Sequence, residues 1–139
     1  MSWHDVHVHG FRLVEGEHGA GELVLDIDYI LEWLRDEESF RFRIAPATLQ
    51  FHQISNLRFY LDYATPTIGI VPFSLNAITR APATYRTGYK TFRWNLEINC
   101  PVGECSFECP GFTQTLRAPE QISNLQRLLP SERGEINGV

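Results

Sequence analysis

The sequence predicts a mainly β protein, a single antiparallel β-rich domain with at most one short helix. Apolar and polar residues alternate with a period of two along most of the chain, which is typical of half-buried strands. Turn-forming stretches interrupt the alternation at spacings typical of a meander. A bent sheet, a two-sheet sandwich and a half-open barrel all fit this pattern.

The composition is that of one globular domain. The chain has 139 residues, of which 43% are hydrophobic, and this is enough to build one packed core. Its net charge of -5 argues against a dedicated nucleic-acid binder. No apolar run approaches the ~20 residues of a membrane helix, and the N-terminus does not resemble a signal peptide. We therefore expect a cytoplasmic protein with three reduced cysteines and no membrane partner.

In the first half of the chain, the alternation predicts five strands. They span residues 3–14, 22–33, 40–44, 48–51 and 57–63, with turns at 15–21 and 53–56 and a solvated loop at 36–39. Apolar residues between Ile27 and Leu34 also fit the spacing of a helical stripe. We favour a strand there, because the alternation begins earlier, at Leu23.

In the second half of the chain, we expect further strands and one short helix. The β-rich stretches are 68–79, 89–99, 105–109 and 112–117, with turns at Thr87-Gly88 and at 101–104. Pro72 indicates a bulge or an edge position. Residues 119–129 are predicted to form a short helix, with Pro119 near its first turn. In this interpretation, 119–139 is a less regular C-terminal tail of the single domain 1–139.

Three motifs resemble those of a family of small, uncharacterised bacterial proteins. They are Leu25-Asp26-Ile27-Asp28-Tyr29-Ile30-Leu31-Glu32-Trp33, Ala45-Pro46-Ala47-Thr48-Leu49-Gln50-Phe51 and Gly111-Phe112-Thr113-Gln114-Thr115-Leu116-Arg117. The similarity covers most of the chain, from Trp3 to Arg117. The opening His4-Asp5 also resembles the start of some toxin-immunity proteins. The resemblance implies a β-rich domain of the bacterial cytosol, but no activity and no catalytic residues.

A cluster of histidines and aspartates is the richest candidate for a chemical site. On a strand, Asp5, His7 and His9 point the same way, and the neighbouring strand adds two aspartates. Imidazole and carboxylate groups together suit a divalent metal such as zinc. A metal-binding protein or metal-dependent hydrolase is therefore the alternative hypothesis. Its ligands would be His7, His9, Asp26 and Asp28.

The register of the first two strands bears on this metal hypothesis. If the paired residue numbers sum to 35, the two histidines face the two aspartates. If they sum to 36, Phe11 faces Leu25 and apolar residues pair with each other. We favour the second register, in which the histidines are partly buried at the rim of the core and no cofactor is bound. Two acids spaced like Asp26 and Asp28 are also what a solvated polar face produces.

The three cysteines do not have the spacing of a structural zinc site. Cys100, Cys105 and Cys109 follow a C-x4-C-x3-C pattern, whereas such sites need four ligands, commonly in closer pairs. Their positions continue apolar faces of the predicted strands. We therefore expect them to be buried as small hydrophobic residues.

The middle of the chain is the best candidate for a binding surface. The first 39 residues hold ten acids and two bases, whereas residues 63–96 hold four bases and no acid. Arginine pairs with carboxylates, and aromatic side chains supply anchoring area. We expect an acidic protein partner, with the acidic first third of a second copy as one option. Single-stranded nucleic acid is disfavoured as a partner by the negative charge of the whole molecule. The candidate partner-binding residues are Arg80, Tyr85, Arg86, Tyr89, Lys90 and Arg93.

The sequence contains no recognised catalytic motif. A Gly-x-Ser-x-Gly elbow, a phosphate-binding glycine loop and a dinucleotide fingerprint are all absent from it. Together with the polarised charge, this favours a non-enzymatic, protein-binding domain with an immunity-like or regulatory role.

Overall fold

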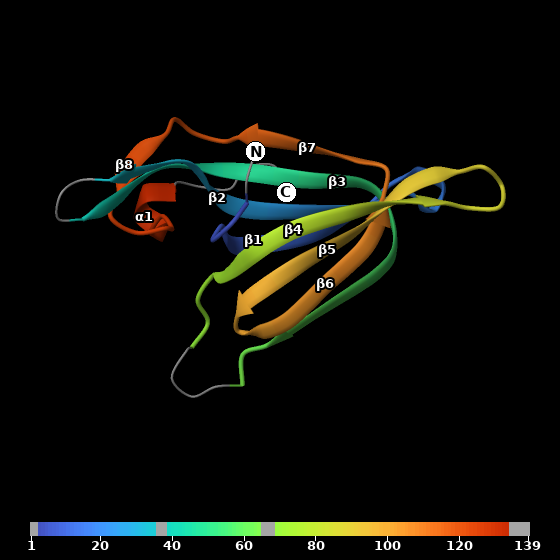
Figure 1. The fold of residues 1–139 in the computed structure, drawn as a ribbon, viewed down its shortest axis with the longest axis horizontal. Coiled ribbons are helices and arrows are strands. Elements are labelled where there is room, and N and C mark those ends of the chain that lie inside the picture. The colour runs from blue at the N-terminus through green and yellow to red at the C-terminus, as the bar shows by residue number, and fades with distance from the viewer. Residues whose placement is uncertain (1–2, 36–38, 65–68, 134–139) are drawn as a thin grey trace.

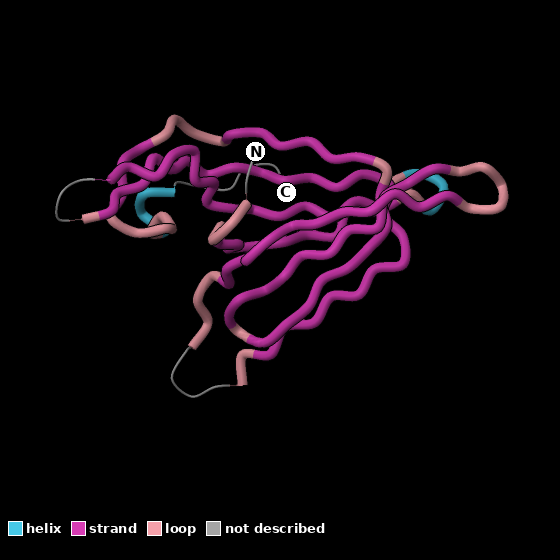
Figure 2. The backbone as a smooth tube through the Cα atoms, in the orientation of Figure 1, coloured by secondary structure: helices cyan, strands magenta, loops and turns pink. Residues whose placement is uncertain are grey.

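The computed structural model describes residues 3–35, 39–64 and 69–133, and most of them lie in strands (Figures 1 and 2). A 3-10 turn, η1 (Glu17–Gly19), follows the first strand, and a four-residue helix, α1 (Pro130–Arg133), ends the described chain. Among these residues, neither helical segment has the length and apolar character that a membrane crossing requires. The strands are β1 (His7–Glu15), β2 (Gly21–Arg35), β3 (Phe40–Asp62), β4 (Phe73–Thr84), β5 (Lys90–Cys100), β6 (Val102–Cys109), β7 (Gly111–Leu116) and β8 (Gln121–Ser123).

All eight strands belong to one antiparallel sheet. Its order is β2-β1-β4-β5-β6-β3-β7, with β8 paired to β3 and an additional pairing between β2 and β3. The sheet therefore bends back on itself, and Figure 1 shows β7, β3 and β2 in one layer and β4, β5 and β6 in the other. β1 and β4 share only the pairs His7–Ser74 and Val8–Phe73, so the sheet is not a closed barrel. The predicted antiparallel, mainly β fold is confirmed.

β3 is the longest strand and carries the chain from one layer to the other. Its first part lies between β2 and β7, and its last part, from Ser55, pairs with β6. The turn predicted at 53–56, which would divide this segment into two strands, is wrong. Gln53 and Asn56 do have positive φ angles, both 51°, but pairing continues between them at Ile54 and Ser55. The two left-handed residues therefore bend the strand without ending it.

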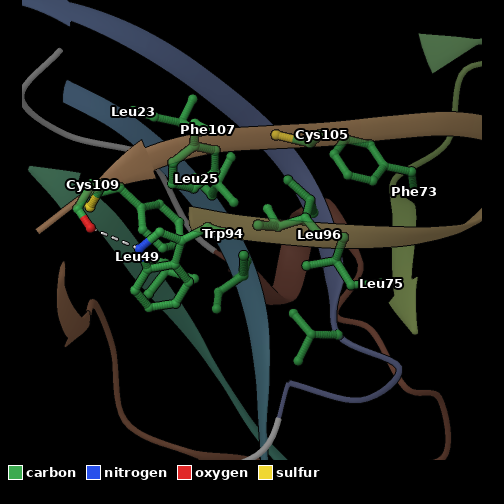
Figure 3. Packing of buried hydrophobic residues seen from close by; sticks show 14 of the residues in the cluster. Leu23, Leu25, Leu49, Phe73, Leu75, Trp94, Leu96, Cys105, Phe107 and Cys109 are labelled. Atoms are coloured by element: carbon green, nitrogen blue, oxygen red, sulfur yellow. Dashed lines mark hydrogen bonds between the residues drawn. The ribbon is translucent and has the colours of Figure 1, made fainter. Parts of the chain in front are cut away.

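The hydrophobic core lies inside the bend, between the two layers (Figure 3). Phe51 of β3 joins the layers, with ring centroids 5.1 Å from Trp94 and 4.7 Å from Phe107. The indole N–H of Trp94 donates to the carbonyl oxygen of Cys109 at 3.0 Å. Leu23 of β2 is fully buried in the same cluster, as the alternation predicted.

Cys105 and Cys109 are buried in this core as free thiols, which confirms the prediction for these two residues. Burial raises the pKa of the Cys105 thiol to about 12 and also raises the pKa of Cys109. Both therefore behave as small hydrophobic groups. The side chain of Cys100 lies outside the described part of the structure.

The first hairpin combines the two registers considered above. Along most of β1 the paired numbers sum to 36, so Phe11 faces Leu25, in the register that we favoured. Near the start of β1 they sum to 35, so His7 faces Asp28. A β-bulge at His9 accounts for the change, because one extra residue on β1 shifts the pairing by one.

Several predicted boundaries need correction. β1 begins at His7 rather than at residue 3, and β4 spans 73–84 rather than 68–79. The helix predicted for 119–129 is wrong, because part of this segment forms β8 and pairs with residues 42–44 of β3. β7 pairs with residues 47–52 of β3, so the edge of β3 at residues 42–44 is free of β7 and is covered by β8. Residues 36–38 of the predicted loop and 134–139 of the predicted tail lie outside the described residues.

Candidate functional site

The carboxylates of Asp26 and Asp28 lie on the face of β2 that is opposite to the main core. The interpretation that they form a solvated polar face is wrong, since these residues are only 1% and 0% exposed. The chain that follows β8 covers this face, where Leu128 packs against Ile30 and Ile44 in a second apolar cluster. A buried carboxylate is costly unless its charge is paired. The partners of the two aspartates therefore decide what this site can do.

Asp28 is paired with the C-terminal helix. Nε and Nη2 of Arg133 donate to the two carboxylate oxygens of Asp28 at 3.0 Å and 2.9 Å. The backbone N–H of Leu128 donates to the same carboxylate at 3.0 Å. Nη2 of Arg133 also donates to the carbonyl oxygen of Leu128 at 2.5 Å. This bidentate ion pair fastens the last described turn of the chain to β2.

Asp26 is paired with the neighbouring strand. Nη1 of Arg12 on β1 donates to Oδ2 of Asp26 at 2.6 Å. Gly10 lies directly over this carboxylate, because a Cβ atom there would come within 3.3 Å of Oδ2. Oδ1 of Asp26 is buried and has no hydrogen-bond partner among the described residues.

His9 lies between these two ion pairs and is neutral. Its Nε2 is 3.1 Å from Nη2 of Arg117 and 3.7 Å from Oδ1 of Asp28. A guanidinium nitrogen only donates, so Nε2 accepts and the ring proton is on Nδ1. Burial, followed by the positive charge of Arg133, lowers the pKa of His9 from 6.5 to about 4.

The structure brings the proposed metal ligands together but pairs them differently. Each aspartate is bound by an arginine, and Nε2 of His9 accepts from a third arginine. Three guanidinium groups against two carboxylates leave one net positive charge, which repels a metal cation. Within the described ranges, no group of three or more His, Cys, Asp or Glu side chains is arranged to hold a metal ion. His7, the fourth proposed ligand, has a buried Nδ1 without a partner in the described chain.

The arginines are the residues that the sequence analysis missed. Arg12 lies 14 residues from Asp26, Arg133 lies 105 residues from Asp28, and Arg117 lies 108 residues from His9. No local pattern connects positions so far apart. The only signal in the sequence is indirect, since buried carboxylates on a strand require cations from elsewhere in the chain.

A second group of polar side chains forms a row of contacts across the outer face of the sheet, from β2 to β7. His52 makes one 2.8 Å contact to Oε1 of Glu22 through Nδ1 and another to Oγ1 of Thr113 through Nε2. The hydrogen bond from His52 lowers the pKa of Glu22. The order hydroxyl, imidazole, carboxylate is that of a hydrolytic triad. Side chains on neighbouring strands commonly pair in this way, so cross-strand pairing accounts for these contacts.

The β4–β5 hairpin extends beyond the rest of the sheet (Figures 1 and 2). Its turn lies where Thr87-Gly88 predicted it, and Gly88 has the positive φ angle of 87° that favours glycine. The rings of Tyr85 and Tyr89 stack across the turn with centroids 6.0 Å apart. All six residues predicted to bind a partner are exposed: Arg80, Tyr85, Arg86, Tyr89, Lys90 and Arg93.

Some of these side chains already have partners within the hairpin region. The Tyr85 hydroxyl donates to Glu108 at 2.5 Å, and a guanidinium nitrogen of Arg93 lies 3.8 Å from the same carboxylate. The guanidinium of Arg80 lies 4.4 Å from the ring centroid of Phe92. Glu108 is buried and its charge is paired. The tip of the hairpin therefore presents positive charge that no neighbouring acid within the described chain neutralises.

Comparison with known proteins does not assign this chain to a family. It matches no protein-family model, and no curated protein is significantly similar to it. The family suggested by its three sequence motifs stays a prediction.

Proposed function

We propose that this chain is a non-enzymatic, protein-binding domain whose binding element is the β4–β5 hairpin. The observation that carries the proposal is the projection of this hairpin beyond the rest of the sheet (Figure 1). Its tip exposes basic and aromatic side chains. Arg86 and Lys90 form no ion pair with any described residue, so their charges are available to a partner. The stacked rings of Tyr85 and Tyr89 add a rigid aromatic anchor.

The partner that fits this tip is an acidic protein surface. Carboxylates pair with arginine and lysine, and tyrosine contributes contact area at a low cost in side-chain entropy. The net charge of -5 opposes binding to nucleic acid as the main role. The resemblance of the sequence motifs implies a protein of the bacterial cytosol, and the role that we propose there is immunity-like or regulatory and needs no catalysis.

Charge reversal at the tip tests this proposal. The wild-type protein, the variant Arg86→Glu/Lys90→Glu and the control Arg58→Glu are each immobilised and exposed to an extract of the source organism. Arg58 is an exposed arginine on β3, so the control changes charge outside the hairpin. Mass spectrometry then quantifies the proteins that each variant retains, and circular dichroism confirms that all three are folded.

We expect the wild type and the control to retain the same acidic protein, and the double variant to lose it by about tenfold or more. The partner is then purified and titrated directly, with binding expected to weaken as salt increases. Equal retention by the double variant contradicts the proposal, as does a wild-type protein that retains no partner.

A further inference from the structure

We propose that a groove beside the β-bulge binds a small amphipathic carboxylate, such as a medium-chain fatty acid. This groove, the His9 groove, has a volume of about 320 Å³, at the small end of the range for ligand pockets. It opens where β1 diverges from β4 after only two residue pairs. Its lining comes from the start of β1, the end of β3, the segment 70–73 and Arg133.

The walls of the His9 groove are apolar and partly exposed. Phe11 and Val71 line it and are 48% and 43% exposed, and Ile70 at its rim is 87% exposed. The Tyr63 hydroxyl donates to the carbonyl oxygen of Val71 at 2.7 Å, which holds the rim segment against β3. Exposed apolar side chains around a concave site are a feature of ligand pockets. A hydrocarbon chain lying there would remove them from water.

The polar end of the groove offers two hydrogen-bond donors. Arg133 lines the groove, and its Nε and Nη2 are occupied by Asp28, so Nη1 is the nitrogen left for a ligand. His9 also lines the groove, and its Nε2 is occupied by Arg117. Nδ1 of the neutral ring therefore carries a proton that it can donate. The network behind the groove holds both side chains in place before a ligand arrives.

The charge of the site selects an anion. Arg133 is the only charged side chain among the described residues of the lining, which include no carboxylate. Together with Arg12 and Arg117 behind it and the two aspartates, Arg133 completes a network with one net positive charge. A carboxylate accepts from an arginine and a second donor in charge-assisted hydrogen bonds. An alcohol of the same length gains the apolar contacts but not this pairing, and an ammonium group is repelled.

Three eight-carbon probes separate these contributions. Octanoate, octan-1-ol and octylammonium are titrated into the whole chain by isothermal calorimetry at pH 7. We expect octanoate to bind about tenfold or more tightly than octan-1-ol, and octylammonium to bind most weakly. The groove lies at the opposite end of β4 from the hairpin tip, so Arg86→Glu/Lys90→Glu should bind octanoate like the wild type. The result is thus independent of the proposed protein partner.

Two substitutions in the groove locate the binding site. Val71→Asp and Ile70→Asp each place a negative charge at exposed lining positions and should weaken octanoate binding by about tenfold or more. Ile122→Asp, at a 53% exposed position on β8, is the matched control and should have no effect. Circular dichroism verifies folding, and either groove variant suffices if the other is unfolded.

Each remaining outcome overturns the inference. Equal affinities for octanoate and octan-1-ol would show that the polar end selects no carboxylate. Wild-type affinity in the folded groove variants would place the ligand elsewhere. Absence of saturable octanoate binding in the millimolar range would show that the groove takes no such ligand.

Discussion

Replacing Asp28 by asparagine tests the buried ion pair that fastens the C-terminal helix to β2. The substitution keeps the shape of the side chain and removes its charge. Asp28 is fully buried, and the side chain of Arg133 is only 8% exposed, so the guanidinium would lose its counter-ion within the protein. Removing one partner of a buried pair costs roughly 3–5 kcal/mol, and we expect Asp28→Asn to lower the free energy of unfolding by about 3 kcal/mol.

Urea unfolding, followed by tryptophan fluorescence, measures this change. The matched control is Glu120→Gln, which removes a carboxylate 3.3 Å from Arg43, where both side chains are about 40% exposed. An exposed pair of this kind contributes less than about 1 kcal/mol. A second arm replaces both Asp28 and Arg133 by leucine. Because this removes both charges of the pair together, we expect the double variant to be more stable than Asp28→Asn.

Two results would refute the reasoning. A loss of less than about 1 kcal/mol in Asp28→Asn would mean that Arg133 does not depend on this carboxylate. A double variant less stable than Asp28→Asn would mean that leucines do not fill the space and that packing, rather than charge, dominates there.

Two further predictions follow from the shifted pKa values. The pKa of His9 is lowered from 6.5 to about 4 in the folded protein, so the unfolded chain takes up the proton first as the pH falls. The free energy of unfolding should therefore keep its full value above pH 6.5 and fall by up to roughly 3 kcal/mol towards pH 4. The decline should be shallower in His9→Gln. An unchanged decline in that variant would show that the lowered pKa of His9 is not its cause. The Cys105 thiol has a pKa of about 12 in the folded protein. At pH 8 it should therefore react with iodoacetamide about three orders of magnitude more slowly in the folded protein than in urea. Peptide mass spectrometry follows the reaction. Similar rates in both conditions would show that this thiol is not held in the core.

The sequence by itself determined the elements whose signal is local. Alternation from Leu23 onward indicates β2 because neighbouring side chains of a strand point to opposite faces, whatever the strand later packs against. Thr87-Gly88 likewise indicates the hairpin turn, since the glycine conformation is set within four residues. The same local signals predicted that Cys105 and Cys109 would lie in the core.

The tertiary structure decided which polar groups are buried and what they contact. Alternation places Asp26 and Asp28 opposite the core face but cannot show that a segment about 100 residues later covers them. It also cannot show which arginines reach them, or that a bulge at His9 shifts the register by one residue. Those outcomes depend on contacts between distant parts of the chain, and the energy of a buried charge is set by the groups that surround it in space.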